Sequence, residues 1–218
     1  MNIRWDIIEE YMPFFLKGTL LTIGISLAGI LIGVLLGLFV ALGRMAPNKL
    51  LRFPFLAYIN CFRGTPVLVQ LFIVHYALLP SIYPDATAMV SAIVTLSLNS
   101  SAYVAEIFRA GIQSIANGQT EAARSLGMNK VQTMRYVILP QAVRRMVPPL
   151  GNEFITLIKE SSLASVIAAK ELMYWGDAAV GQYYVVWEPY ITVAVIYLII
   201  VLGLTYLLQV VEKRWVQA

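Results

Sequence analysis

Two carboxylic acids stand out in the sequence because they interrupt an otherwise apolar run. Glu153 and Glu160 are seven residues apart, so on a helix they lie almost one above the other, about 10 Å apart along the axis. Thr156 falls between them on the same face. Ionisable groups in an apolar span are costly, and they usually face a cavity or a pathway. Two stacked carboxylates would form a negative site that suits the cationic group of a ligand.

An alternative explanation is that the polar groups of this run form satisfied pairs between helices. Lys159 lies about 100° round the helix from the acids, so it is poorly placed to neutralise either carboxylate within the same helix. We expect Lys159 to pair instead with Glu106 of another apolar run. For Glu153 and Glu160, both explanations remain open.

The composition indicates a protein that lies in a membrane. Of its 218 residues, 59% are hydrophobic and 13% are charged, whereas a soluble domain carries about 25% charged residues. A helix needs about 20 apolar residues to cross the hydrocarbon core. Five runs fit this length, at about 18–42, 54–79, 86–108, 146–169 and 189–211. We therefore predict one all-α transmembrane domain over residues 1–218, built as a five-span helical bundle.

The basic residues predict how this bundle is oriented. Lys and Arg are concentrated in the segments after the first and third runs, while the N-terminal tail and the other loops are neutral or acidic. Cytoplasmic loops are enriched in Lys and Arg, so we predict that the N-terminus lies outside and the C-terminus inside. The net charge of +4 is spread over short loops between apolar runs, so we expect lipid and no nucleic acid as a partner.

Residues typical of catalytic and metal sites are scarce. Cys61 and His75 are the single cysteine and the single histidine, which excludes an internal disulfide and a Cys- or His-rich metal cluster. The sequence has no G-x-x-x-x-G-K-[ST] phosphate-binding loop. We predict a non-catalytic chain that binds no metal or cofactor of its own.

Two further patterns concern helix contacts. Gly29, Gly33 and Gly37 repeat at every fourth position of the first run, which permits a second helix to approach closely. The longest predicted cytoplasmic segment, about 110–145, contains a short amphipathic pattern that begins near Gln119. Such a helix either lies on the lipid surface or docks in a groove on a cytoplasmic partner.

Several motifs in this chain resemble those of the permease subunits of bacterial ABC importers. The pattern Glu121-Ala122-Ala123-x3-Gly127-x9-Val137-x-Leu139-Pro140 resembles their EAA loop, with Val137 where the family usually has isoleucine. The segments 62–66 (FRGTP), 101–112 (SAYVAEIFRAGI) and 152–163 (NEFITLIKESSL) resemble the branch that transports polar amino acids. The resemblance covers about residues 14–211.

The resemblance implies the type I ABC importer permease fold in the bacterial cytoplasmic (inner) membrane. It implies that a cytoplasmic coupling helix with Glu121, Ala122, Ala123 and Gly127 docks on a separate ATP-hydrolysing subunit, which binds the ATP and the Mg. It also implies a second permease subunit, for which a homodimer is simpler than a heterodimer, and an extracytoplasmic amino-acid-binding protein.

Combined with the two acids of the fourth run, the resemblance predicts a polar, basic amino acid as the transported substrate: arginine, lysine or histidine. The substrate's own carboxylate would need donors, for which Asn99, Ser100 and Tyr103 are candidates. Arg63 either holds a loop or gate or extends to the membrane interface. The alternatives are a glutamine or glutamate permease of the same family, a secondary transporter driven by an ion gradient, and a membrane scaffold or exporter subunit.

Overall fold

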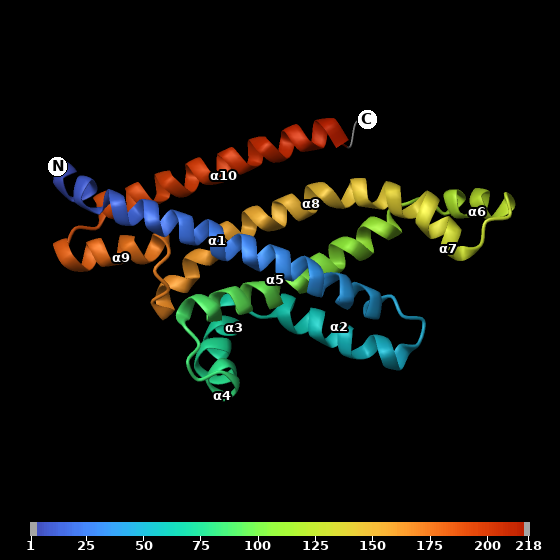
Figure 1. Cartoon of the computed structure of the whole chain (residues 1–218), viewed down its shortest axis with the longest axis horizontal. Helices are drawn as coiled ribbons and strands as arrows, with labels where there is room; N and C mark the ends of the chain where they lie inside the picture. Colours follow the sequence, from blue (N-terminus) through green and yellow to red (C-terminus); the bar gives the residue numbers. More distant parts are fainter. Residues whose placement is uncertain (1–3, 216–218) are drawn as a thin grey trace.

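The computed structural model describes residues 4–215, and helices make up most of them (Figure 1). The α-helices are α1 (Trp5–Arg44), α2 (Lys49–Gly64), α3 (Val67–Ile73), α4 (Leu79–Ile82), α5 (Ala88–Gln113), α6 (Asn117–Ser125), α7 (Lys130–Gln132), α8 (Leu139–Glu160), α9 (Leu172–Tyr183) and α10 (Trp187–Trp215). Two π-helical segments, Val74–Leu78 and Thr133–Ile138, lead into α4 and α8, and a 3-10 segment, Ser161–Ile167, follows α8.

Among the described residues, fewer helices are long and apolar enough to cross a membrane than the sequence predicts. Within residues 4–215, α1, α5 and α10 are long and apolar enough to cross a membrane, and α2 with α3–α4 would be a fourth span if this bent pair is counted as one. The fourth predicted run falls mainly on α8, which carries several charged side chains and is not among the candidate spans. The number of five spans therefore stays a prediction.

The predicted second span is not one straight helix, because the chain turns by 111° between α2 and α3. Pro66 has no backbone N–H, and the residue before a proline is pushed out of the helical region. Thr65 accordingly adopts an extended conformation, with φ −122° and ψ 148°. We refer to residues 62–66 as the α2–α3 corner.

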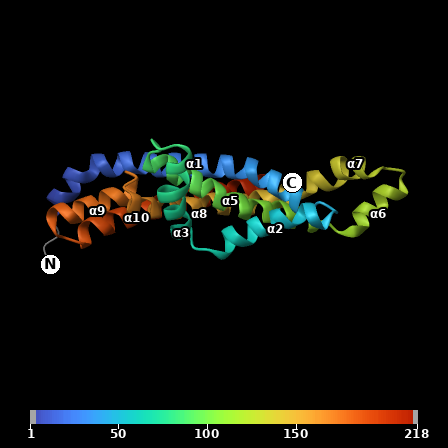
Figure 2. The same ribbon diagram turned by 90° about the horizontal axis from the view of Figure 1, so that it is seen from below.

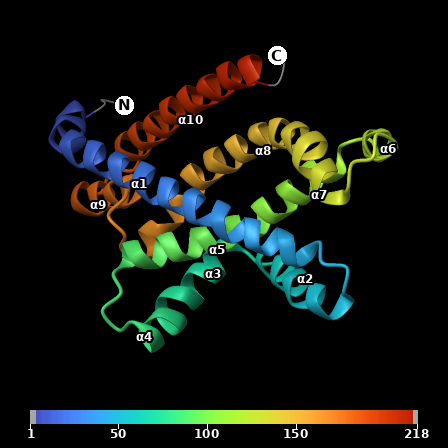
Figure 3. The ribbon, with the colours of Figure 1, turned by 45° about the vertical axis from the view of Figure 1, so that its right-hand side comes forward.

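The longest helix, α1, packs along α5 more extensively than any other pair of described elements (Figures 1 and 3). It starts at Trp5 and not near residue 18. The glycine seam, which consists of Gly29, Gly33 and Gly37, faces Leu96, Ser100 and Val104 of α5. A Cβ atom at Gly33 would lie 3.0 Å from Ser100 Cβ, and one at Gly37 would lie 2.7 Å from Val104 Cγ1. The predicted close helix contact is therefore confirmed.

We expect Gly37→Leu to destabilise the protein, because its Cβ would also lie 2.9 Å from the backbone oxygen of Ser101. Overpacking of this kind costs about 1–3 kcal/mol. The melting temperature of the purified protein in detergent measures the effect. Gly24→Leu is the matched control, because a Cβ at Gly24 would meet no atom within 4 Å. Equal melting temperatures for the two variants would contradict the described contact between α1 and α5.

Two groups of elements lie at opposite ends of the long axis of the molecule. The segments α6 and α7 project at one end, and α9 lies at the other, beside the start of α1 (Figures 1 and 2). The helix α10 is largely uncovered along its apolar length. The cavity described next lies among α2, α5 and α8, between these two ends.

Candidate functional site

A cavity of about 530 Å³ opens among the end of α2, the second half of α5 and the middle of α8. Its lining includes several charged side chains, which are costly to take out of water unless they are paired. The charged and aromatic side chains that line it are Arg63, Tyr103, Glu106, Arg109, Arg145 and Glu153.

Three residues of the predicted site line this cavity. Glu153 comes from α8, Tyr103 from α5 and Arg63 from the last turn of α2. The guanidinium carbon of Arg63 lies 5.2 Å from the centre of the Tyr103 ring, close enough for a cation–π contact. The structure thus brings one predicted acid together with one predicted donor and the predicted gate residue.

The other predicted substrate-binding residues do not line this cavity. Asn99 and Ser100 are fully buried in α5, and Asn99 Nδ2 already donates to Gln70 Oε1 at 2.9 Å. Glu160 lines a separate small pocket beside Thr95 and Leu96. Thr156 Oγ1 donates to the backbone oxygen of Asn152 at 3.0 Å. The two acids therefore share a face of α8 without sharing one cavity within the described chain.

The predicted pair between Lys159 and Glu106 is wrong. Glu106 Oε2 lies 2.7 Å from Arg109 Nη2, and Glu106 Oε1 lies 3.3 Å from Arg44 Nε. The helices α5 and α8 run in opposite directions, so the end of α8 lies level with Leu96 and about 15 Å along α5 from Glu106. Lys159 is exposed there.

Arg109 and Arg145 are cavity residues that sequence reasoning missed. In the sequence both belong to the basic residues after the third run, which indicate orientation and no cavity. Arg145 Nη1 donates to the backbone oxygen of Ser114 at 2.5 Å, which ties the start of α8 to the end of α5. The eight-residue spacing between Arg145 and Glu153 was the available signal, since residues seven or eight apart share a helix face.

The coupling residues predicted by the resemblance lie together at the projecting end. Glu121, Ala122 and Ala123 lie within α6, which begins at Asn117 after Ala116 and not at the predicted cap near Gln119. Gly127 adopts a left-handed conformation with φ +83°, and this residue ends α6 as glycine commonly ends helices.

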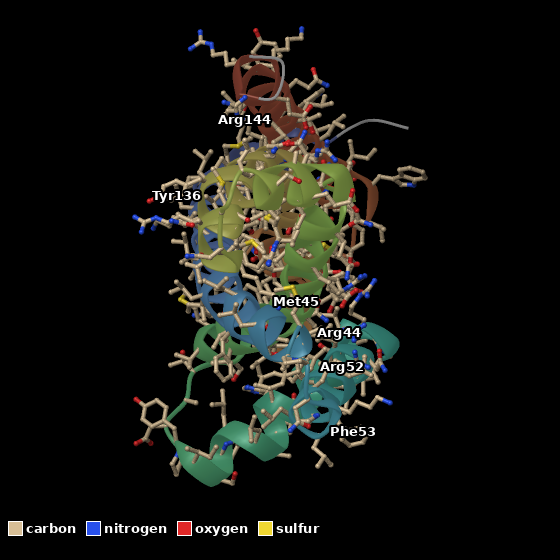
Figure 4. The ribbon with its side chains drawn as sticks, turned by 90° about the vertical axis from the view of Figure 1, so that its right-hand side faces the viewer. Arg44, Met45, Arg52, Phe53, Tyr136 and Arg144 are labelled. Carbon is tan, nitrogen blue, oxygen red and sulfur yellow. The ribbon has the colours of Figure 1, made fainter. Side chains whose placement is uncertain are left out.

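Beyond Gly127 the chain forms a second short helix whose start is firmly capped. Asn129 and Gln132 bond reciprocally at the start of α7, which is a capping box. Large apolar side chains flank the turn and remain exposed; they are Leu126, Val131, Met134 and Tyr136. Figure 4 shows Arg44, Arg52 and Arg144 at the end of the molecule that also carries Tyr136.

At the opposite end, a buried carboxylate fastens three helices, and sequence reasoning missed it. Glu171 caps α9 by accepting from the backbone N–H groups of Met173 and Tyr174 at 2.9 and 2.8 Å. It also accepts from the hydroxyls of Tyr197 on α10 at 2.8 Å and Thr22 on α1 at 3.3 Å. Burial raises the pKa of Glu171 to about 6, although these donors act in the opposite direction. The carboxylate form, which accepts all four bonds, therefore predominates at neutral pH. We call this set the Glu171 junction.

The long apolar helices, the capped turn at one end and the cavity lined by charged side chains are typical of a membrane transport subunit. Residues 11–217 match the family described as the binding-protein-dependent transport system inner membrane component. The chain belongs to this family. It is an integral inner-membrane permease subunit with the type I ABC importer fold, and it is not an enzyme.

Individual relatives narrow the transported class to amino acids. The chain is 40% identical to the probable amino-acid ABC transporter permease protein YckA of Bacillus subtilis (strain 168), over 98% of this chain and 97% of that one. It is 38% identical to the glutamine transport system permease protein GlnP of Escherichia coli (strain K12), over 98% of each. A crystal structure described as an amino acid ABC transporter with histidines matches at a TM-score of 0.92 and 42% identity, covering 98% of this chain and 100% of that one.

These findings confirm that the chain is an amino-acid ABC transporter permease. They set aside a secondary transporter and a membrane scaffold, because the family transports with a binding protein. Membership implies an ATP-binding subunit and a substrate-binding protein as partners.

Proposed function

We propose that the chain forms the translocation path for a basic amino acid and that the cavity among α2, α5 and α8 is part of that path. The distribution of charge around the cavity is the observation that carries the proposal. Glu153 and Arg145 stand on the α8 side, about two turns apart on one face, and Arg63 stands on the α2 side. An amino acid presents an ammonium and a carboxylate, so these groups match it at both ends.

The choice of a basic side chain rests on the second acid. Glu160 lies seven residues beyond Glu153, about 10 Å further along α8 on the same face. Glu160 lines a separate pocket, and a lysine, arginine or histidine bound near Glu153 would direct its second cationic group out of the cavity along this face. The description of the matching crystal structure, which mentions histidines, agrees with this class. The glutamine permease relative favours the alternative of a glutamine or glutamate substrate.

The donors for the substrate carboxylate differ from those first expected. Asn99 and Ser100 are buried within the helix bundle, so Tyr103 is the one predicted donor that lies on the cavity wall, and Arg63 joins it there. The Glu106 carboxylate is bonded more closely by Arg109 and Arg44 than by Arg63, whose Nη1 atom lies 4.0 Å from Glu106 Oε2.

The assembly is proposed as a homodimer of this chain above two ATP-binding subunits. The few spans of one chain do not enclose a complete path. A second copy would supply the opposite wall. In this arrangement Glu121, Ala122, Ala123 and Gly127 contact the ATP-binding subunit, and the exposed Leu126 and Val131 fill its groove. The N-terminus then lies outside and the C-terminus inside, as the positions of Lys and Arg predict.

Uptake of labelled arginine into proteoliposomes tests the substrate class. The vesicles contain the chain with its ATP-binding subunit, with or without ATP, and unlabelled lysine, histidine, glutamine and glutamate serve as competitors. We expect ATP-dependent uptake that lysine or histidine competes for. Competition by glutamine or glutamate alone would exclude a basic substrate, and uptake without ATP dependence would overturn the transport mechanism.

Removal of each acid tests its role in substrate binding. We expect Glu153→Gln and Glu160→Gln each to raise the apparent KM for arginine by about tenfold or more, because a hydrogen bond to a charged group contributes about 1.5–3 kcal/mol. Glu9→Gln, which changes an exposed acid near the start of α1, is the matched control. If both variants transported arginine like the wild type, the two acids would have no part in substrate binding.

A further inference from the structure

The last backbone carbonyls of α2 lack their usual helical partners at the α2–α3 corner, and side chains pair two of them, those of Cys61 and Phe62. In a continuous helix the Phe62 oxygen would accept from the backbone nitrogen of residue 66, but Pro66 carries no hydrogen. The Cys61 oxygen would accept from residue 65, but Thr65 is extended. Unpaired carbonyls at membrane depth are costly, so other donors must satisfy them.

Side chains supply both donors. Thr65 Oγ1 donates to the Cys61 oxygen at 2.8 Å. Gln70 Nε2, from the first turn of α3, donates to the Phe62 oxygen at 2.8 Å and also approaches the Thr65 oxygen at 3.1 Å. Gln70 is 94% buried, with 6% of its surface exposed. Its amide thus takes the place of the N–H that Pro66 lacks.

The orientation of this amide is fixed by its neighbours. Carbonyl oxygens only accept, so the Nε2 atom of Gln70 must point toward Phe62 and Thr65. The Oε1 atom then points the other way, where it accepts from Asn99 Nδ2 of α5 at 2.9 Å. One directed chain of hydrogen bonds therefore connects α5 to the corner.

Arg63 is part of this corner. Its backbone follows Phe62, the residue that Gln70 holds, and its side chain lines the cavity. The Arg63 guanidinium lies over Tyr103 and is 4.0 Å from Glu106 Oε2. Asn99, Tyr103 and Glu106 succeed one another at spacings of four and three residues along α5, so one helix face receives both the corner and the arginine.

We propose that Gln70 and Asn99 form a positioning pair for transport: they hold the α2–α3 corner against α5 and thereby place Arg63 in the wall of the translocation cavity. The pair acts through Arg63, and its role in uptake rests on the proposed function of that cavity. Asn99 is therefore a positioning residue and not a donor to the substrate.

The discriminating variant is Gln70→Glu. The change keeps the size of the side chain, but a carboxylate has no N–H to donate. Its oxygens would face the Phe62 and Thr65 carbonyl oxygens and repel them. We expect uptake to fall by about tenfold or more, since displacement of a positioned group by one ångström can cost about a hundredfold in rate. Gln182→Glu is the matched control, because Gln182 Oε1 accepts from Tyr11 Oη and a carboxylate accepts there equally well.

A double-mutant cycle separates positioning of Arg63 from general damage. We expect Arg63→Ala with Gln70→Glu to transport no worse than Arg63→Ala alone, because the same interaction is already lost. Three results would each overturn the proposal. They are losses that multiply in the double variant, wild-type uptake by Gln70→Glu, and wild-type uptake by Arg63→Ala. Protein amount and melting temperature are measured for every variant, so that uptake is compared per folded complex.

Cys61 offers a direct measurement that needs no transport. It is the single cysteine, it is exposed, and it lies in the last turn of α2 next to the corner. A nitroxide attached to Cys61 should become more mobile in the electron paramagnetic resonance spectrum of Gln70→Glu, and it should not in Gln182→Glu. An unchanged spectrum in Gln70→Glu would overturn the positioning pair even if uptake by that variant falls. Absence of ATP-dependent uptake by the wild type, by contrast, would refute the proposed function. The spectrum would then still test whether Gln70 and Asn99 hold the α2–α3 corner.

Discussion

Gly127→Pro is expected to abolish ATP-driven uptake while the protein remains inserted in the membrane. Gly127 has φ +83°, whereas proline requires a φ near −65°. Its backbone N–H also donates to the Arg124 oxygen at 3.0 Å, and proline has no such hydrogen. The substitution therefore breaks the turn between α6 and α7, and force from the ATP-binding subunit no longer reaches α5 and α8.

The measurement compares uptake, ATP hydrolysis and membrane content in the same preparation. Gly127→Ala should fall between wild type and proline, because an L-residue in the left-handed region costs about 1–2 kcal/mol. Gly118→Ala is the control, since a Cβ at Gly118 would meet no atom within 4 Å. Normal uptake by Gly127→Pro would show that this turn does not transmit the action of the ATP-binding subunit.

Glu171→Leu should cause a large loss of stability. The change leaves four donors of the Glu171 junction without their acceptor; Thr22 is buried and the other three are partly buried. A buried group left unsatisfied costs about 1–3 kcal/mol. For a chain of this length, about 1 kcal/mol corresponds to roughly 2–4 °C in melting temperature. We therefore expect a fall of well over about 5 °C in detergent, together with loss of the contacts among α1, α9 and α10.

Graded variants identify the source of that loss. Tyr197→Phe removes one donor and keeps the carboxylate, so its effect should be small. Glu171→Gln keeps one acceptor oxygen and should be intermediate. Glu9→Leu changes an exposed acid of α1 and serves as the control. A melting temperature of Glu171→Leu equal to that of Glu9→Leu would show that the junction does not stabilise the fold.

Hydropathy predicted the long helices α1, α5 and α10 from the sequence, because a membrane-spanning helix must be apolar along its whole length. It failed at the α2–α3 corner, because the predicted run 54–79 passed through Arg63 and Pro66 as if they belonged to one helix. Pro66 was visible in the sequence, but a proline alone does not distinguish a kinked span from two helices that diverge by 111°. The difference depends on side chains such as Gln70 that satisfy the carbonyls at the break.

The sequence likewise predicted only part of the candidate site. Spacing along α8 placed Glu153 and Glu160 on one face, since periodicity fixes directions around a helix. It does not fix which neighbour covers each turn, so Glu160 proved to lie beside Thr95 and not in the larger cavity. The partners of Glu106 likewise depend on which residues of α8 lie level with it on α5. The periodicity of one helix does not predict this alignment between two helices.

The glycine seam also has a consequence for the synthesis of the protein. The residues that cover it, Leu96, Ser100 and Val104, leave the ribosome only after the whole of α2, α3 and α4. At about 5–20 residues per second, the interval lasts several seconds. During it, α1 lies in the bilayer with a bare small-residue face, the kind of surface that drives helices to associate. The length of chain between α1 and α5 thus sets the period in which α1 is open to pairing with the wrong helix, including the α1 of another nascent copy.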